Sequence, residues 1–124
     1  MTPAAYVYGI LADNIDSIPF LKADDIYTFG VDDSVCSDVI VLITEAPGTG
    51  DDYGNDNILY TNKRIQIDFY YPKDYEEDMN ALEQSLKNVL RDNGVYCYSD
   101  AGHVLSLDSR NITNTLKFNI KMEV

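Results

Sequence analysis

The stretch KRIQIDFYYPKDYEEDMNALEQSLKNVLRDNG, residues 63–94, decides the fold. Its first part alternates apolar and polar side chains, which is the pattern of a strand with one buried face. Pro72 ends this strand, because proline has no N–H to donate to a neighbouring strand. The residues expected on the buried face are Ile65, Ile67, Phe69 and Tyr71.

A helix follows the proline. Asp74 is placed to cap it, and Glu77 three residues later completes a capping-box pattern. Gly94 occupies the position of a left-handed residue after the helix end. The sequence therefore predicts a helix over residues 74–92 that lies across its own sheet. Its apolar stripe, at helical spacing, consists of Met79, Leu82, Leu86, Val89 and Leu90.

The rest of the chain supplies a second helix and further strands. Thr2 is a hydroxyl cap and Pro3 a proline at the first helical position, so we expect a helix near residues 3–13. Only Asn114 interrupts the apolar row of the last strand. We predict one α+β domain over residues 1–124, in the order α-β-β-β-α-β-β, with two helices on one face of an antiparallel-dominated sheet of about five strands. The expected strands lie near residues 26–31, 39–45, 60–71, 95–99 and 112–123.

The middle of the chain has two unusual segments. Residues 39–44, VIVLIT, are apolar almost throughout, which is typical of a central strand covered on both faces by helices or by a neighbouring subunit. Residues 45–57, EAPGTGDDYGNDN, contain three glycines, one proline, four acids and no base. We interpret this second segment as a mobile acidic loop between two strands, much longer than most hairpin loops.

The net charge of −12 is unevenly distributed. Residues 1–60 carry eleven acids and a single base, Lys22, whereas residues 61–124 carry ten acids and eight bases. Such a surface argues against direct binding to nucleic acid, whose phosphates require Lys and Arg. It is compatible with a surface that DNA passes without adhering, and also with a simple role in solubility.

Motifs for catalysis or metal binding are weak. The one histidine, His103, could pair with Cys97 as base and nucleophile, but a surface histidine is the ordinary interpretation. Cys36 and Cys97 are expected to be free thiols. An EF-hand register fails from either Asp51 or Asp52, and residues 53–59 resemble only one turn of a calcium-binding repeat that works in series. We expect no enzymatic activity, no cofactor and no metal site.

Ten tyrosines and no tryptophan point to a possible interface. Tyr70, Tyr96 and Tyr98 fall on or near the solvent-facing sides of strands. Tyrosine is enriched at protein interfaces, although it is also common in ordinary strands. Together with the apolar segment 39–44, these tyrosines favour an oligomeric surface.

The chain is expected in a cytosol. No apolar run approaches the ~20 residues that cross a bilayer. The first residues, MTPAAYVYGILAD, lack the basic start and long apolar core of a signal peptide.

The order and length of these elements resemble the tail-completion or tail-terminator proteins of long-tailed bacteriophages, particularly the small ones from phages of Gram-positive bacteria. The resemblance covers nearly the whole chain. It is best at RIQIDFYYP, the proline turn and the helix with an acidic start. Members of this family form a ring, usually hexameric, that caps the tail tube, stops its polymerisation and presents a docking surface for the head. The resemblance therefore implies a non-enzymatic virion assembly protein of a phage or prophage.

The resemblance also implies partners and a location. The partners are further copies of the chain, the tail tube protein and the head–tail connector proteins, while DNA passes through the lumen without specific binding and no membrane is involved. The protein would be in the host cytoplasm during assembly and then at the head-proximal end of the virion tail. Loops between strands make axial contacts in this family. The candidate interface residues are Gly48, Gly50, Asp51, Asp52, Tyr53, Asp56, Tyr70, Tyr96 and Tyr98.

Two other classes of protein are alternatives. A small host-encoded α+β regulatory or ligand-binding domain would be a monomer or dimer with a closed apolar pocket. An enzyme would have a cleft with a perturbed His103 or aspartate pair.

Overall fold

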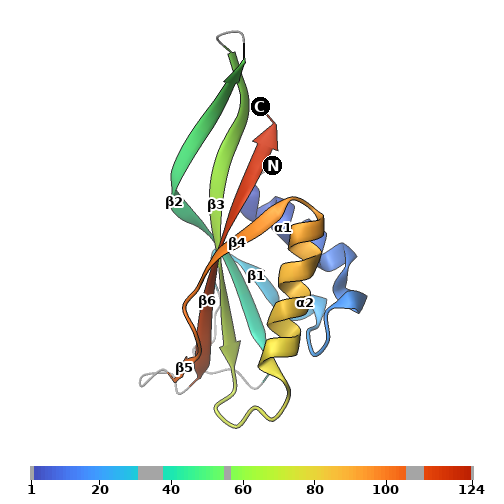
Figure 1. Ribbon diagram of the computed structural model, residues 1–124. Coiled ribbons are helices and arrows are strands. Elements are labelled where there is room, and N and C mark those ends of the chain that lie inside the picture. The colour runs from blue at the N-terminus through green and yellow to red at the C-terminus, as the bar shows by residue number, and fades with distance from the viewer. Residues whose placement is uncertain (1, 31–37, 55–56, 106–110, 124) are drawn as a thin grey trace.

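The computed structural model describes residues 2–30, 38–54, 57–105 and 111–123. These residues form two α-helices and a six-stranded sheet (Figure 1). Residues 46–54, 57–61 and 121–123 are described by their backbone alone. Short 3-10 turns, η1 (Ile15–Ser17) and η2 (Ala23–Asp25), join α1 to β1. The helices and strands are α1 (Pro3–Asp13), β1 (Ile26–Thr28), β2 (Ile40–Gly54), β3 (Asn57–Tyr71), α2 (Met79–Asp92), β4 (Val95–Asp100), β5 (Val104–Leu105) and β6 (Ile112–Glu123).

The strand order in the sheet is β1-β2-β3-β6-β4, with β5 also paired to β6. β1 pairs with β2 in parallel, and every other pairing is antiparallel. The predicted α+β class with an antiparallel-dominated sheet is confirmed. This order leaves β1 and β4 at opposite edges of the sheet.

Both helices pack on one face of the sheet and enclose the core. α1 lies against β1, β2 and β3, and α2 lies against β4 and α1 (Figure 1). Val7 and Leu11 of α1, and Leu82, Leu86 and Leu90 of α2, are fully buried. The strands contribute alternate side chains to the same core, as their period of two predicts. These are Val41, Ile43, Ile65, Ile67, Phe69, Tyr71, Val95, Leu116, Phe118 and Ile120.

The interpretation of residues 45–57 as a loop is wrong. β2 and β3 pair from Ile40↔Tyr70 to Gly54↔Asn57, so most of this segment is strand. The register shifts between Ala46 and Gly50, and residues 47–49 of β2 lie opposite residue 63 of β3. A bulge of this kind accommodates Pro47, which has no N–H for the ladder. The proline and glycines therefore mark an irregularity within a long hairpin.

The predicted start of the second helix is also wrong. α2 begins at Met79, and Asp78 caps it by accepting a hydrogen bond from the Ala81 N–H at 3.1 Å. The proposed Asp74 cap lies within a turn in which the Tyr75 N–H donates to the Pro72 carbonyl at 3.0 Å. Two aspartates satisfy the cap preference, and the one directly before the apolar stripe is used. The left-handed glycine after the helix is confirmed, with φ 83° at Gly94.

The first two strands differ from expectation in extent and cover. β1 ends at Thr28 because Phe29 has φ 68°, in the left-handed region. In β2, Val41 and Ile43 are buried, but Ile40 and Leu42 on the other face are only half-buried. Both described helices lie on the face of the sheet that carries Val41 and Ile43, so the expected cover of both faces by helices is wrong. Cover by a neighbouring subunit stays a prediction.

Candidate interaction surface

The β4 edge carries Tyr96 and Tyr98, the more exposed of the predicted interface tyrosines whose side chains the structure describes. Tyr96 is 58% exposed and Tyr98 45%. The Arg64 guanidinium of β3 lies over the Tyr98 ring, 5.5 Å from its centroid. This distance is within the range of a cation–π contact, which holds the Tyr98 ring on the sheet surface.

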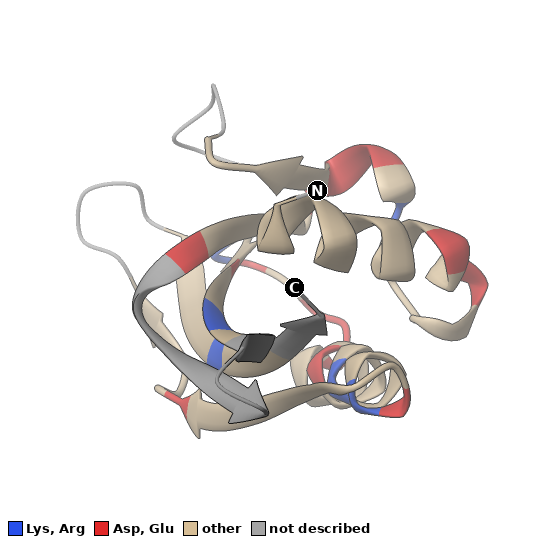
Figure 2. Ribbon diagram, turned by 90° about the horizontal axis from the view of Figure 1, so that it is seen from above, with Lys and Arg blue, Asp and Glu red and all other residues tan. Residues whose placement is uncertain are grey.

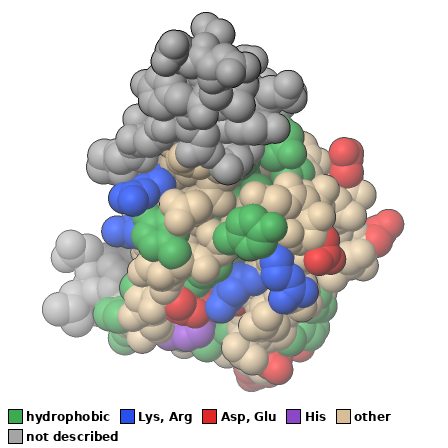
Figure 3. All heavy atoms as spheres, turned by 45° about the horizontal axis from the view of Figure 1, so that its top comes forward, with side chains coloured by type: hydrophobic (Ala, Val, Ile, Leu, Met, Phe, Trp, Pro, Cys, Tyr) green, Lys and Arg blue, Asp and Glu red, His purple; other side chains and the backbone are tan. Residues whose placement is uncertain are grey.

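Cations from α2 extend this edge. A groove of about 190 Å³ lies between α2 and β4. The Arg91 side chain is 60% exposed, and its Nε lies 3.9 Å from Asp92 Oδ1, at the outer limit of an ion pair. On the face shown in Figure 3, Lys and Arg side chains gather around hydrophobic ones. The groove is lined by Gln84, Lys87, Asn88, Arg91, Tyr96 and Cys97.

Asp100 compensates one of these cations. Its carboxylate lies 3.2 Å from Lys87 Nζ and accepts a hydrogen bond from the Gly102 N–H at 3.1 Å. Burial by itself raises the pKa of Asp100, but hydrogen bonds from Asn114, Lys87 and Gly102 outweigh burial and hold the pKa below its ordinary value. Asp100 is therefore ionised at neutral pH, and Arg91 is the cation of this groove with the weaker compensation. We call the surface formed by Arg64, Lys87, Arg91, Tyr96 and Tyr98 the basic edge.

The opposite edge of the sheet is acidic. Asp24 and Asp25 form the end of η2 and lead directly into β1. Burial, followed by the nearby charge of Asp38, raises the pKa of Asp25. In Figure 2, acidic residues lie near η2 and the end of α1, while α2 carries both acidic and basic residues. Lys22 Nζ lies 3.3 Å from Asp38 Oδ2 and compensates one acid of this edge. Tyr27 and Phe29 are 37% and 59% exposed here. We call the surface formed by Asp24, Asp25, Tyr27, Phe29 and Asp38 the acidic edge.

A buried polar cluster joins α2 to the sheet. Glu83 is 3% exposed. Its carboxylate accepts hydrogen bonds from Tyr71 Oη at 2.5 Å and from Asn114 Nδ2 at 2.6 Å, and it contacts His103 Nε2 at 2.7 Å. Burial and the hydrogen bond to Glu83 raise the pKa of Tyr71 above its ordinary value. Cys97 Sγ instead contacts the Ser99 carbonyl at 3.4 Å, so Cys97 and His103 have different partners.

The cluster gives Glu83 a structural role. Three groups from β3, β6 and the segment after β4 converge on one carboxylate of α2. A buried carboxylate needs such hydrogen-bond partners, and the three present here leave little capacity for a further donor. The sequence carried two signals of this cluster. Asn114 interrupts an apolar row, and Glu83 lies within the apolar stripe of the helix.

A family model matches residues 3–123. The chain belongs to the family described as "Protein of unknown function (DUF806)". The match extends from α1 to β6 and so includes the sheet, both helices and the two edges. Among curated proteins, no match to this chain is found.

This DUF806 chain places the predicted interface residues in three separate regions. Tyr96 and Tyr98 lie on the basic edge. Tyr70 is half-buried at the other end of β3, opposite Ile40 and Thr113, and burial followed by the charge of Asp68 raises its pKa. Asp56 lies outside the described residues. The remainder lie in the outer part of β2: Gly48, Gly50, Asp51, Asp52 and Tyr53.

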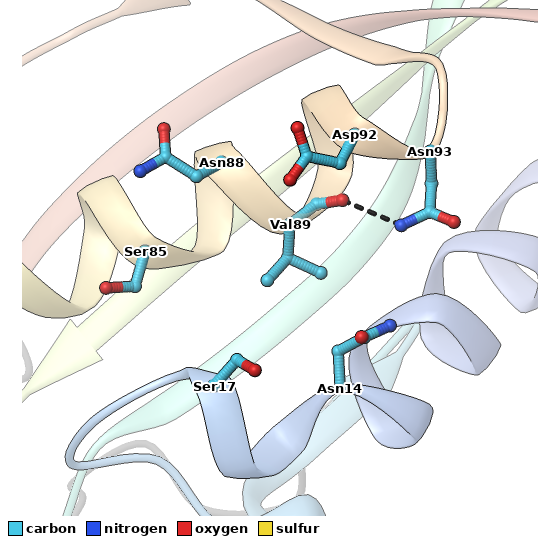
Figure 4. Close-up of a pocket in the computed structure, with 7 residues that line it drawn as sticks. All are labelled: Asn14, Ser17, Ser85, Asn88, Val89, Asp92 and Asn93. Carbon is cyan, nitrogen blue, oxygen red and sulfur yellow. Dashed lines mark hydrogen bonds between the residues drawn. The ribbon is translucent and has the colours of Figure 1, made fainter.

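Another hollow of the DUF806 domain is polar. It has a volume of about 290 Å³ and lies between η1 and the C-terminal half of α2 (Figure 4). Val89 is its one apolar lining residue, and the Val89 carbonyl accepts a hydrogen bond from Asn93 Nδ2 at 2.8 Å. This differs from the closed apolar pocket expected of a ligand-binding domain. The other lining residues are Asn14, Ser17, Ser85, Asn88, Asp92 and Asn93.

The described part of the chain has neither a cluster of metal ligands nor a helix that could span a membrane. There, no group of three or more His, Cys, Asp or Glu side chains is arranged to hold a metal ion. Neither described helix is long and apolar enough to cross a membrane.

Proposed function

We propose that this chain is a non-enzymatic virion assembly protein that forms a ring, caps the phage tail tube, stops its polymerisation and provides the surface that joins tail to head. The observation that carries the proposal is an arm of the sheet that extends beyond the helices (Figure 1). We define the arm as residues 46–54, 57–63 and 121–123.

The arm consists of paired strands that extend beyond the ends of β1 and β4. The β1 ladder ends at Thr28↔Ile43 and the β4 ladder at Val95↔Ile120. Beyond these points β2, β3 and β6 continue together, with β2 and β3 paired to Gly54↔Asn57. At about 3.3 Å per residue, the arm is roughly 25–30 Å long. A narrow ribbon of strands is marginally stable without packing, which favours a role in contacting other molecules.

The sequence of the arm fits a surface next to a DNA channel. Its outer β2 segment, APGTGDDYG, contains Asp51 and Asp52 and no base, and Asp56 follows, whereas the bases of the arm, Lys63 and Lys121, lie on β3 and β6. The acidic surface is therefore the β2 side of the arm. A carboxylate-rich surface repels phosphate groups, so DNA would pass it without adhering. The resemblance to tail terminators gives such loops and hairpins an axial position, where this property is needed.

The two different edges of the sheet fit a closed ring. Contacts between two unlike surfaces continue from subunit to subunit and close when the rotation allows. A chain with a basic edge and an acidic edge has such unlike surfaces available. In the resembling family the ring is usually a hexamer.

The proposal is tested by assembly and by capping. Light scattering across protein concentration should show a ring that strengthens as salt rises, because salt at 0.1 M screens exposed charges beyond ~10 Å and this chain carries −12. Added to growing tail tubes, the protein should fix their length. A chain that stays monomeric at high concentration and high salt, and leaves tube growth unchanged, would refute the proposal.

The channel role of the arm has a separate test. Replacing Asp51, Asp52 and Asp56 with Asn should leave tail assembly intact and make DNA adhere to the ring or leave it slowly. If head attachment fails instead, the arm is a docking element and does not line the channel. The control replaces three carboxylates between β3 and α2 with their amides, and these are Asp74, Glu76 and Glu77.

A further inference from the structure

We infer that the basic edge of one copy binds the acidic edge of the next copy, so that neighbouring subunits meet head to tail through opposite edges of the sheet. The inference rests on the proposed ring, because the partner that binds each edge is a second copy of this chain. It adds which surfaces meet and which charges select them. Charge pairs enclosed in the contact are screened by salt much less than the repulsion between whole chains of charge −12, so the ring should still strengthen as salt rises.

Charge complementarity identifies the occupant. The whole chain carries −12, yet bases flank β4: Arg64 lies over the Tyr98 ring, and Lys87 and Arg91 line the groove beside Tyr96. At the other edge, Asp24 and Asp25 stand directly before β1. Such opposite patches guide association and suppress contacts between like surfaces. Two basic edges would repel one another, and so would two acidic edges, which excludes a two-fold contact through either edge alone.

Both edges also offer unpaired backbone and exposed rings. Within the described ranges, β1 has one strand partner, β2, and β4 has one, β6. Exposed strand edges are sites at which further chains add. Tyr27 and Phe29 stand at one edge, and Tyr96 and Tyr98 at the other. Aromatic side chains at exposed positions supply the apolar contact area typical of interface centres.

The groove between α2 and β4 is the part of the basic edge into which a side chain of the next copy would insert. Lys87, Arg91 and Tyr96 line its volume of about 190 Å³, which is large enough for an aspartate side chain. Asp24 is exposed on the short η2 turn and is the carboxylate of the acidic edge best placed to enter. The guanidinium of Arg91 is suited to hold a carboxylate through two parallel hydrogen bonds.

Charge reversal tests this pairing. The basic-edge variant carries Lys87→Glu and Arg91→Glu, and the acidic-edge variant carries Asp24→Lys and Asp25→Lys. Each variant alone should need at least about tenfold more protein to assemble, since one repulsive contact of about 1.4 kcal/mol is worth that factor. A mixture of the two should assemble again, because each then meets a neighbour of opposite charge on both sides.

A four-fold variant that carries all four reversals is the matched control. Two cations become acids and two acids become cations, so its net charge stays at −12. It should assemble by itself, like the wild type, which separates the contact from the effect of total charge. Melting temperatures confirm that each variant is folded. If Lys87→Glu weakens the fold beside Asp100, the pair Arg91→Glu and Asp24→Lys gives the same test.

The outcomes separate this inference from the proposed function. If either variant alone forms rings at the wild-type concentration, or if the mixture does not recover, the contact lies elsewhere and the inference is overturned while the ring stands. If the wild type forms no ring and caps no tube, the proposed function itself is refuted.

Discussion

Replacing Glu83 with alanine should destabilise the fold strongly without touching either edge of the sheet. The substitution removes the acceptor of Tyr71 Oη and Asn114 Nδ2, both buried. An unsatisfied buried group costs about 1–3 kcal/mol, so these two give a loss of about 2–6 kcal/mol. His103 contributes less, because its half-exposed ring can turn to water. Such a loss is a large part of the ~5–15 kcal/mol that holds a domain together.

The free energy of unfolding, measured by urea denaturation, gives the magnitude. Glu83→Gln should lose less than Glu83→Ala, about 1 kcal/mol, because its amide oxygen accepts from Asn114 and its NH₂ donates to the Tyr71 hydroxyl oxygen. Gln84→Ala is the matched control, since Gln84 is the exposed neighbour on α2 and its Nε2 donates to the Asn88 side chain, away from the cluster. If Glu83→Ala unfolds at the same urea concentration as Gln84→Ala, the cluster does not tie α2 to the sheet.

Three further predictions concern the fold. Leu86→Asp should prevent folding, because it places an unpaired charge at a fully buried position, and a wild-type melting temperature would contradict this. Stability should fall above pH 10 by up to about 1.4 kcal/mol per pH unit for Tyr71, since its raised pKa keeps the folded state protonated while the unfolded chain ionises. Unfolding measured from pH 9 to 11.5 should show a shallower decline for Tyr71→Phe, and an unchanged slope would refute the assignment. Asp78→Ala should lower the free energy of unfolding by about 1 kcal/mol through the lost helix cap, and Asp74→Ala by less than about 0.5 kcal/mol. A larger loss for Asp74→Ala than for Asp78→Ala would show that Asp74 is the cap.

Regular periodicity made much of the fold predictable. The alternation in β3 and β6 and the stripe of α2 each predict one buried face. These faces pack against one another in the core between the sheet and the helices. Turn residues misled the prediction where a tertiary ladder outweighs local preference. Pro47 and the glycines after it are loop formers in isolation, but pairing with β3 holds them in a bulged strand.

The candidate surface was less accessible to prediction. Tyr96 and Tyr98 were found because alternation in a short strand fixes which side chains face outward. The basic edge was missed because Arg64 and Arg91 are separated along the sequence and reach the same edge of the sheet only through the order β3-β6-β4. Local sequence gives no information about strand order, so a surface assembled across strands remains hidden until the topology is known.

The position of β6 has a consequence for how the chain folds. β6 follows the other described strands in the sequence, yet it lies between β3 and β4 and is the strand partner of both. β4 therefore lacks its strand partner until residues 112–123 have been synthesised. Contacts between distant parts of a chain form slowly, and open strand edges invite aggregation meanwhile. The edge at which a neighbouring subunit would bind is thus completed only after residues 112–123 have been synthesised, which delays assembly until this sheet has formed.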